Sequence, residues 1–186
     1  MENKERVAIY IDGSNLYHKL KDLGVPNTTS FNYSGLCDKL ARGREVISYR
    51  YYVGAIRAKV GDAKGQQLRA NQQRLFNSLL KQKFCIKQGQ FLMNNGKYHE
   101  KGVDVKMAVD LLTGAYDDLY DTAILLSSDS DLNPAVMKTK HLGKKLEYIG
   151  FSHNPCFSLQ KVATLSRLLI KDDLDEFITP TLPLGK

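Results

Sequence analysis

The sequence has few cysteines and no long apolar run, and each shortage excludes a class of protein. The three cysteines, Cys37, Cys85 and Cys156, are an odd number and form no Cys-x-x-Cys pair, so neither a disulfide framework nor a zinc ribbon is predicted. No stretch reaches the ~20 apolar residues that span a bilayer. Residues 1–6 carry two acids and do not read as a signal peptide. We therefore expect a cytoplasmic protein that does not bind a membrane.

Internal repeats and low-complexity tracts are also lacking, which favours one globular domain. The 186 residues are 42% apolar and 25% charged, the proportions of a chain that can bury its own core. We expect a domain over residues 1–178 and a loose C-terminal tail over 179–186. The assembly state stays open, with a homodimer as one option.

Positive charge exceeds negative charge in this chain. There are 27 Lys and Arg residues against 20 Asp and Glu, which gives a net charge of +7 at pH 7. A basic surface favours polyanions, and nucleic acid above all. Because many soluble proteins are basic for no specific reason, charge supports this partner only together with a site.

Runs rich in β-branched and aromatic residues alternate with segments of helical period. Strands are expected over residues 7–11, 46–55, 84–87, 123–126 and 146–149, and helices over 15–23, 33–41, 66–81, 131–142 and a stretch around 105–112. Two short helices are expected after residue 154, and a hairpin over 91–102 that turns at 94–96. The alternation predicts an α/β fold, a single-domain α/β/α sandwich with a mostly parallel five-stranded sheet.

Aspartates stand where the predicted strands end. Asp12 follows the first strand, Asp129 and Asp131 follow the fourth, and Asp104 begins the long helix between them. In an open parallel sheet, sites form outside the carboxyl ends of the strands, so these acids are expected to converge. Crowded carboxylates repel one another unless a cation lies among them, and hard divalent ions such as Mg²⁺ and Mn²⁺ prefer oxygen ligands. The sequence thus predicts a metal site.

Helix capping is the competing explanation for each acid. Ser128 and Asp131 fit a capping box, with Ser128 as the N-cap. Asp12 fits a cap of the first helix, and Asp104 fits a carboxylate at a helix N-terminus. Capping explains each acid singly, but it does not explain why all of them fall at one edge of the sheet.

Three motifs together resemble a known family. They are YIDGSNL at residues 10–16, KGVD at 101–104 and SSDSDL at 127–132. In this order and spacing they resemble the NYN domain family, LabA-like branch, of the PIN-like nuclease superfamily, and the resemblance runs over residues 7–149. It implies a PIN-like fold and a metal-dependent endoribonuclease that uses Mg²⁺ or Mn²⁺.

The resemblance also assigns roles to single residues. The positions that match the metal-binding acids are Asp12, Asp104 and Asp129, with Asp131 as a more peripheral acid of the same pocket. Asn15 matches an asparagine that orients the first aspartate or a water. Small polar residues are expected to line the substrate side of the pocket, namely Ser14, Ser127 and Ser128.

Basic residues on two predicted loops are expected to hold the phosphate backbone of single-stranded or structured RNA. These residues are Arg57, Lys59, Lys97 and Lys101. Phosphate contacts position a strand without reading its sequence, so weak sequence preference is expected. Tyr51, Tyr52 and Tyr98 could stack on bases, although core packing is favoured for the first two.

Other functions remain to be weighed against a nuclease. A nucleic-acid-binding regulatory protein with a metal pocket but little or no catalysis would need the same residues. A haloacid-dehalogenase-type phosphatase would need a second Asp two residues after Asp12, where Ser14 stands. The four histidines show no ligand spacing, and His99 is the one expected near the path of a substrate.

Overall fold

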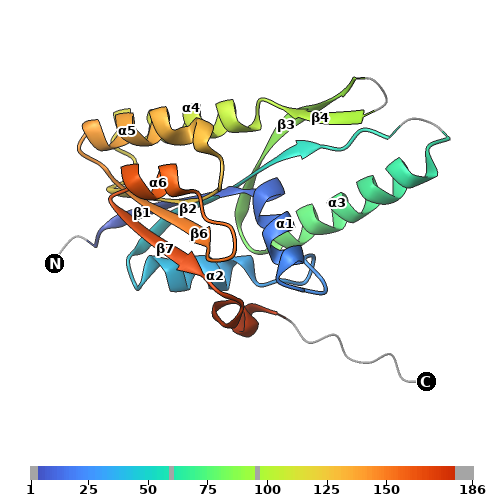
Figure 1. Cartoon of the computed structure of the whole chain (residues 1–186), viewed down its shortest axis with the longest axis horizontal. Helices are drawn as coiled ribbons and strands as arrows, with labels where there is room; N and C mark the ends of the chain where they lie inside the picture. Colours follow the sequence, from blue (N-terminus) through green and yellow to red (C-terminus); the bar gives the residue numbers. More distant parts are fainter. Residues whose placement is uncertain (1–3, 59–60, 95–96, 179–186) are drawn as a thin grey trace.

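The computed structural model describes residues 4–58, 61–94 and 97–178, with the side chains of all these residues except 90–94 and 97–100 (Figure 1). The strands are β1 (Arg6–Asp12), β2 (Glu45–Ala55), β3 (Phe84–Asn94), β4 (Lys97–Lys101), β5 (Thr122–Leu126), β6 (Lys145–Phe151) and β7 (Leu165–Leu169). They form one sheet of seven strands in the order β4-β3-β2-β1-β5-β6-β7. All neighbours are parallel except β3 and β4, which form an antiparallel hairpin.

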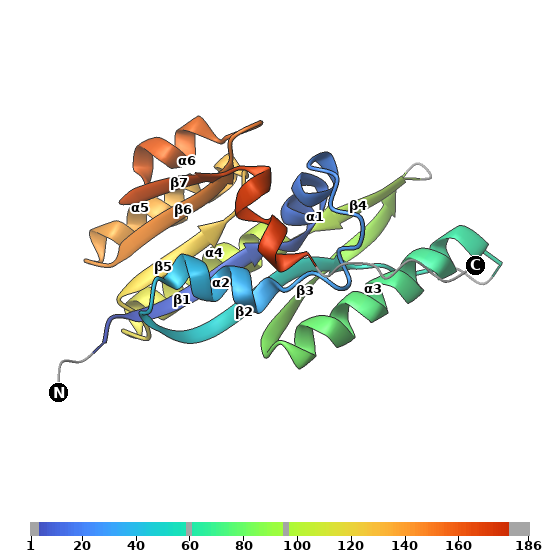
Figure 2. The same cartoon turned by 90° about the horizontal axis from the view of Figure 1, so that it is seen from below.

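Helices cover both faces of this sheet. They are α1 (Gly13–Asp22), α2 (Tyr33–Ala41), α3 (Ala63–Lys81), α4 (Val103–Tyr116), α5 (Asn133–His141) and α6 (Phe157–Val162), with short 3₁₀ turns η1 (Ser130–Leu132), η2 (Lys171–Asp173) and η3 (Asp175–Phe177). Figures 1 and 2 show α1, α2 and α3 on one side of the sheet and α4, α5 and α6 on the other. This is the α/β/α sandwich that the sequence predicted.

The central strand β1 is buried on both faces because its residues alternate between two cores. Val7, Ile9 and Ile11 pack with the α1–α3 side, whereas Ala8 and Tyr10 pack with the α4–α6 side. All five are fully buried. A nearly continuous apolar run is what a parallel strand covered on both faces requires.

The predicted number of strands was too low. All five predicted strands are present, and a mostly parallel sheet is confirmed, but β4 and β7 extend it at its two edges. The hairpin predicted over 91–102 pairs Asn94 with Lys97 as part of the sheet, and its turn residues 95 and 96 lie outside the described residues. Between residues 155 and 178 the structure has the short helix α6, the strand β7 and the 3₁₀ turns η2 and η3, and β7 was not predicted. Its sequence LSRLL is exposed at one end and buried only at Leu169, so it carries little strand signal.

The chain order of the strands reverses between β1 and β5, which are neighbours in space. At such a switch point, the loops after the two strands diverge and leave a crevice. Gly13 allows α1 to begin against the sheet there. A Cβ at Gly13 would lie 2.2 Å from Cε1 of Tyr51 and 2.8 Å from the carbonyl oxygen of Tyr52, so only glycine fits.

Among the described helices, none combines the length and the apolar composition needed to cross a bilayer.

Candidate metal centre

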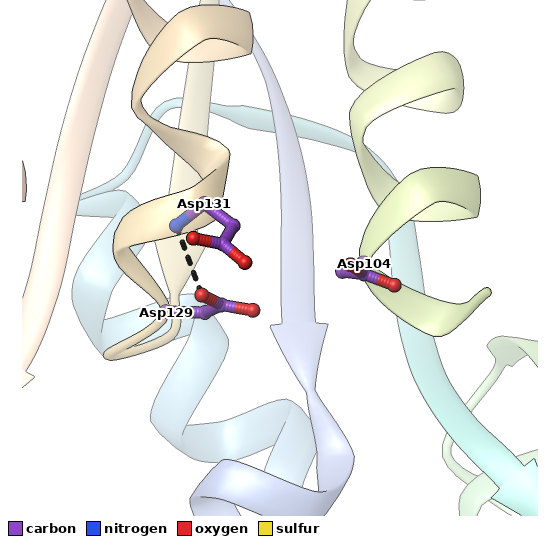
Figure 3. Close-up of side chains that lie close together, drawn as sticks. All are labelled: Asp104, Asp129 and Asp131. Atoms are coloured by element: carbon purple, nitrogen blue, oxygen red, sulfur yellow. Dashed lines mark hydrogen bonds between the residues drawn. The ribbon is translucent and has the colours of Figure 1, made fainter. Parts of the chain in front are cut away.

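Three of the predicted aspartates meet at the switch point. Asp104 lies in the first turn of α4, while Asp129 and Asp131 lie in and after the loop that follows β5 (Figure 3). One carboxylate oxygen from each lies within 4.8 Å of the other two. Asp104 and Asp129 are half-buried and Asp131 is exposed. Residues 25 or more positions apart in the chain are therefore brought together by the fold.

The turn that carries two of these acids is fixed by a local hydrogen bond. The backbone N–H of Asp131 donates to Oδ1 of Asp129 at 2.9 Å, so that Asp129 is the N-cap of η1 (Figure 3). The prediction that Ser128 caps this turn was wrong. Asp129 is one residue closer to the 3₁₀ turn, and this tighter turn precedes α5 instead of the expected continuous helix. The second oxygen of Asp129 is not used by this cap.

Asp12 is tied to the same site through a buried serine. Its Oδ1 accepts from the backbone N–H of Asn15 at 3.0 Å, which caps α1 as predicted. Its Oδ2 accepts from Oγ of Ser127 at 3.1 Å, and that Oγ in turn accepts from the backbone N–H of Asp129 at 3.1 Å. Ser127 is only 2% exposed. It therefore positions Asp12 and Asp129 relative to each other and is too buried to reach a large substrate.

An open cavity of about 530 Å³ lies over Asp12, Asp104 and Asp129. Its lining residues are Asp12, Ser14, Asn15, His18, Val103, Asp104 and Asp129, and we call it the acidic cavity. Sequence reasoning missed His18. The signal was available, since His18 is four residues after Ser14 and three after Asn15 on a helix that starts at the first aspartate.

Comparison with known proteins identifies the family of the chain. A family model of the NYN domain matches residues 6–168 of the chain. The chain belongs to the NYN domain family. This confirms the NYN part of the resemblance carried by the three motifs, and the chain has a candidate acidic metal site. The LabA-like branch and the PIN-like nuclease superfamily stay predictions.

Two similar proteins have no described function. A crystal structure of a protein of unknown function from Vibrio parahaemolyticus has a TM-score of 0.68 at 23% identity, covering 94% of the NYN chain and 98% of its own. An uncharacterized protein of Methanocaldococcus jannaschii is 28% identical over 165 residues, and the NYN chain spans about half of its length, 54%.

A third similar protein has a named activity. It is a flap endonuclease of bacteriophage T5, crystallised with DNA and metal ions, with a TM-score of 0.48 at 15% identity, covering 84% of the NYN chain and 60% of its own.

The spacing of the carboxylates suits a divalent ion. Oxygens on opposite sides of Mg²⁺ at ~2.1 Å would be about 4.2 Å apart, slightly less than the observed 4.8 Å limit. Small side-chain rotations, or bridging waters, would complete the coordination. Without a cation, unit charges at about 4 Å repel by about 1 kcal/mol in water and about 4 kcal/mol at the effective dielectric constant of a protein surface. Asp104, Asp129 and Asp131 would hold the ion, and oxygen ligands alone favour Mg²⁺ or Mn²⁺.

Two other acids of the NYN domain, Asp121 and Asp110, bind side chains that account for their positions without a metal ion. Asp121, at the opposite end of the sheet, lies 2.8 Å from Nη2 of Arg6. Hydrogen bonds from Arg6 lower the pKa of Asp121 to about 2. Asp110 accepts from the hydroxyl of Tyr52 at 2.8 Å. Within the described part of the chain, no ion pair to a basic side chain involves Asp104, Asp129 or Asp131.

Of the predicted basic residues, the two whose side chains are described, Arg57 and Lys101, do not line the acidic cavity. Arg57 lines a separate cavity of about 420 Å³ together with Arg69 of α3. Lys101 is exposed at the end of β4, next to the start of α4. Lys59 and the side chain of Lys97 lie outside the described residues, as does the side chain of His99.

The tyrosines predicted in the core are there. Tyr51 and Tyr52 are 1% and 0% exposed, which confirms packing over base stacking. The side chain of Tyr98 lies outside the described residues.

Proposed function

We propose that this NYN domain is a metal-dependent endoribonuclease, with Mg²⁺ or Mn²⁺ held by Asp104, Asp129 and Asp131. The observation that supports it most is the approach of three carboxylates to within 4.8 Å at the switch point, beside an open cavity. The net charge of +7 supports a polyanionic substrate.

The residues around the acidic cavity would have different roles in cleavage. A bound ion would polarise a phosphoryl oxygen and ease the deprotonation of water. Asp12, oriented by the Asn15 N–H and the Ser127 hydroxyl, faces the same cavity and is placed to accept a proton from attacking water. His18 and Ser14 lie on the α1 side, where they can donate to phosphate oxygens.

Internal cleavage is testable with a substrate that has no ends. Circular single-stranded RNA incubated with the protein and Mn²⁺ is expected to become linear, because the cavity is open and does not require a chain terminus. EDTA in place of Mn²⁺ is expected to leave the circle intact. The measurement is a denaturing gel that separates circular from linear RNA.

A regulator that binds without cutting gives a different result. In that case the circle stays intact with Mn²⁺ over many hours, while a native gel shows a retarded RNA–protein band. This outcome would overturn the nuclease proposal and favour the regulatory function.

A further inference from the structure

A second cavity, of about 550 Å³, lies beside the acidic cavity between α1 and α3. The segment after α1 and the end of β2 close it. Its apolar walls include Val25, Val53 and Leu75, and its polar groups include Asn27 and Asn71. A volume of this size, mostly apolar with a few polar groups, is typical of sites for small organic ligands or parts of larger ones.

Helix α1 forms the boundary between the two cavities. Ser14, Tyr17, His18 and Lys21 follow the i, i+3, i+4, i+7 spacing that places side chains on one face of a helix. Tyr17 and Lys21 line the second cavity alone, whereas Ser14 and His18 line both cavities. A flexible chain that occupies the acidic cavity can therefore continue across α1 into the second cavity.

Helix α3 provides the opposite wall by the same periodicity. Leu68, Asn71, Gln72 and Leu75 all line the cavity and lie on one face of α3. Gln72 anchors this face to the sheet, because its Nε2 donates to the carbonyl of Gly54 at 2.7 Å and its Oε1 accepts from the N–H of Ile56 at 2.9 Å. The wall is therefore fixed before a ligand binds.

The charge of the second cavity is opposite to that of the first. Its lining includes the cations Lys21 and Arg74 and, among the described residues, no Asp or Glu. The Nζ of Lys21 lies 5.8 Å from the centre of the Tyr17 ring, and Tyr17 is 38% exposed. Exposed cations beside an apolar, partly aromatic hollow match a nucleotide, in which a phosphate adjoins a flat base.

We propose that the second cavity binds the base of one nucleotide of a single-stranded RNA, adjacent to the phosphate that the acidic cavity would cleave. This rests on the proposed nuclease function for its biological role. Lys21 and Arg74 contact the neighbouring phosphate, and the base lies between Tyr17 on α1 and Leu75 on α3. A base must leave its stack to enter such a cavity, so double-stranded RNA is excluded.

The binding of free nucleotides tests this proposal without metal or cleavage. AMP and UMP are titrated into the isotope-labelled protein in EDTA, with ribose 5-phosphate as the ligand that lacks a base. Both nucleotides are expected to bind at least about tenfold more tightly than ribose 5-phosphate, since stacking and apolar contact act on the base. Chemical shifts are expected to move at Val25, Val53 and Leu75.

Two matched variants of α3 give the control. Asn71 and Asn77 are both exposed, and each accepts a hydrogen bond at 3.2 Å from the glutamine four residues earlier, Gln67 and Gln73. Asn71 also accepts one from Nη1 of Arg74 at 3.1 Å. Asn71→Trp fills the second cavity and is expected to weaken AMP binding at least about tenfold, whereas Asn77→Trp lies away from the cavity and is expected to change it less than about twofold.

The outcomes separate this proposal from the nuclease proposal. Equal binding of AMP and ribose 5-phosphate, shifts that map elsewhere, or equal effects of the two tryptophan variants would overturn the base site even if RNA is cleaved. A base preference that Asn71→Trp removes would establish the site even if circular RNA stays intact. Where the wild type cleaves, Asn71→Trp is expected to raise KM for single-stranded RNA and Asn77→Trp to leave it unchanged.

Discussion

Asp104→Asn is expected to slow Mn²⁺-dependent RNA cleavage by at least about 100-fold. In metalloenzymes, removing a residue that only hydrogen-bonds to a metal ligand already lowers metal affinity or activity by about 10- to 100-fold. Removing a ligand itself is expected to lower activity by at least as much. Asparagine keeps the size of the side chain but removes the charge that attracts the ion. The measurement is the single-turnover rate on circular single-stranded RNA.

The stability of the Asp104→Asn variant shows whether Asp104 acts as a metal ligand or is needed for the fold. In EDTA, Asp104→Asn is expected to be as stable as the wild type or slightly more so, because it relieves repulsion from Asp129 and Asp131. In Mn²⁺ the wild type is expected to gain melting temperature and the variant to gain less. The matched control is Asp117→Asn at the exposed C-terminal end of the same helix, about 20 Å away by the helical rise. If Asp104→Asn cleaves RNA as fast as Asp117→Asn, Asp104 is not a metal ligand.

Two substitutions of Asp12 are expected to divide its structural role from its chemical role. Asp12→Asn keeps an oxygen that can cap α1 through the N–H of Asn15, so its free energy of unfolding is expected to stay near that of the wild type. Asp12→Ala removes the cap and is expected to lose about 1 kcal/mol. Both variants are expected to lose cleavage by at least about 100-fold, because a carboxylate of the acidic cavity is absent from both.

Chemical denaturation and cleavage assays on the pair of variants check this division. Normal cleavage by Asp12→Asn, together with the loss of stability in Asp12→Ala, would reduce Asp12 to a helix cap. The site would then consist of Asp104, Asp129 and Asp131 alone.

Asp12, Asp129 and Asp131 could be predicted from sequence because they follow strand ends marked by short-range signals, and Asp104 because it stands at the start of a helix. Apolar runs mark β1 and β5, and parallel strands place the residues that follow them at one edge. The same reasoning could not decide which residue caps η1, because Ser128 and Asp129 are both good N-caps and one residue of register separates the two alternatives.

The second cavity could not be predicted from the sequence. Lys21 and Arg74 lie on the faces of two helices that are remote in sequence, and only the packing of α1 and α3 against the same part of the sheet brings them to one cavity. The basic residues that were predicted for this role, such as Arg57, were chosen because they lie in loops. Helix faces carry the same charge without any local motif to mark it.

A crystal soaked in Mn²⁺ tests the central claim most directly. Anomalous difference density is expected at the switch point, ~2.1 Å from carboxylate oxygens of at least two of Asp104, Asp129 and Asp131. Carboxylates more than about 10 Å apart, where two charges barely interact, or a fully soaked crystal with no density among them, would contradict the metal centre and the nuclease function built on it.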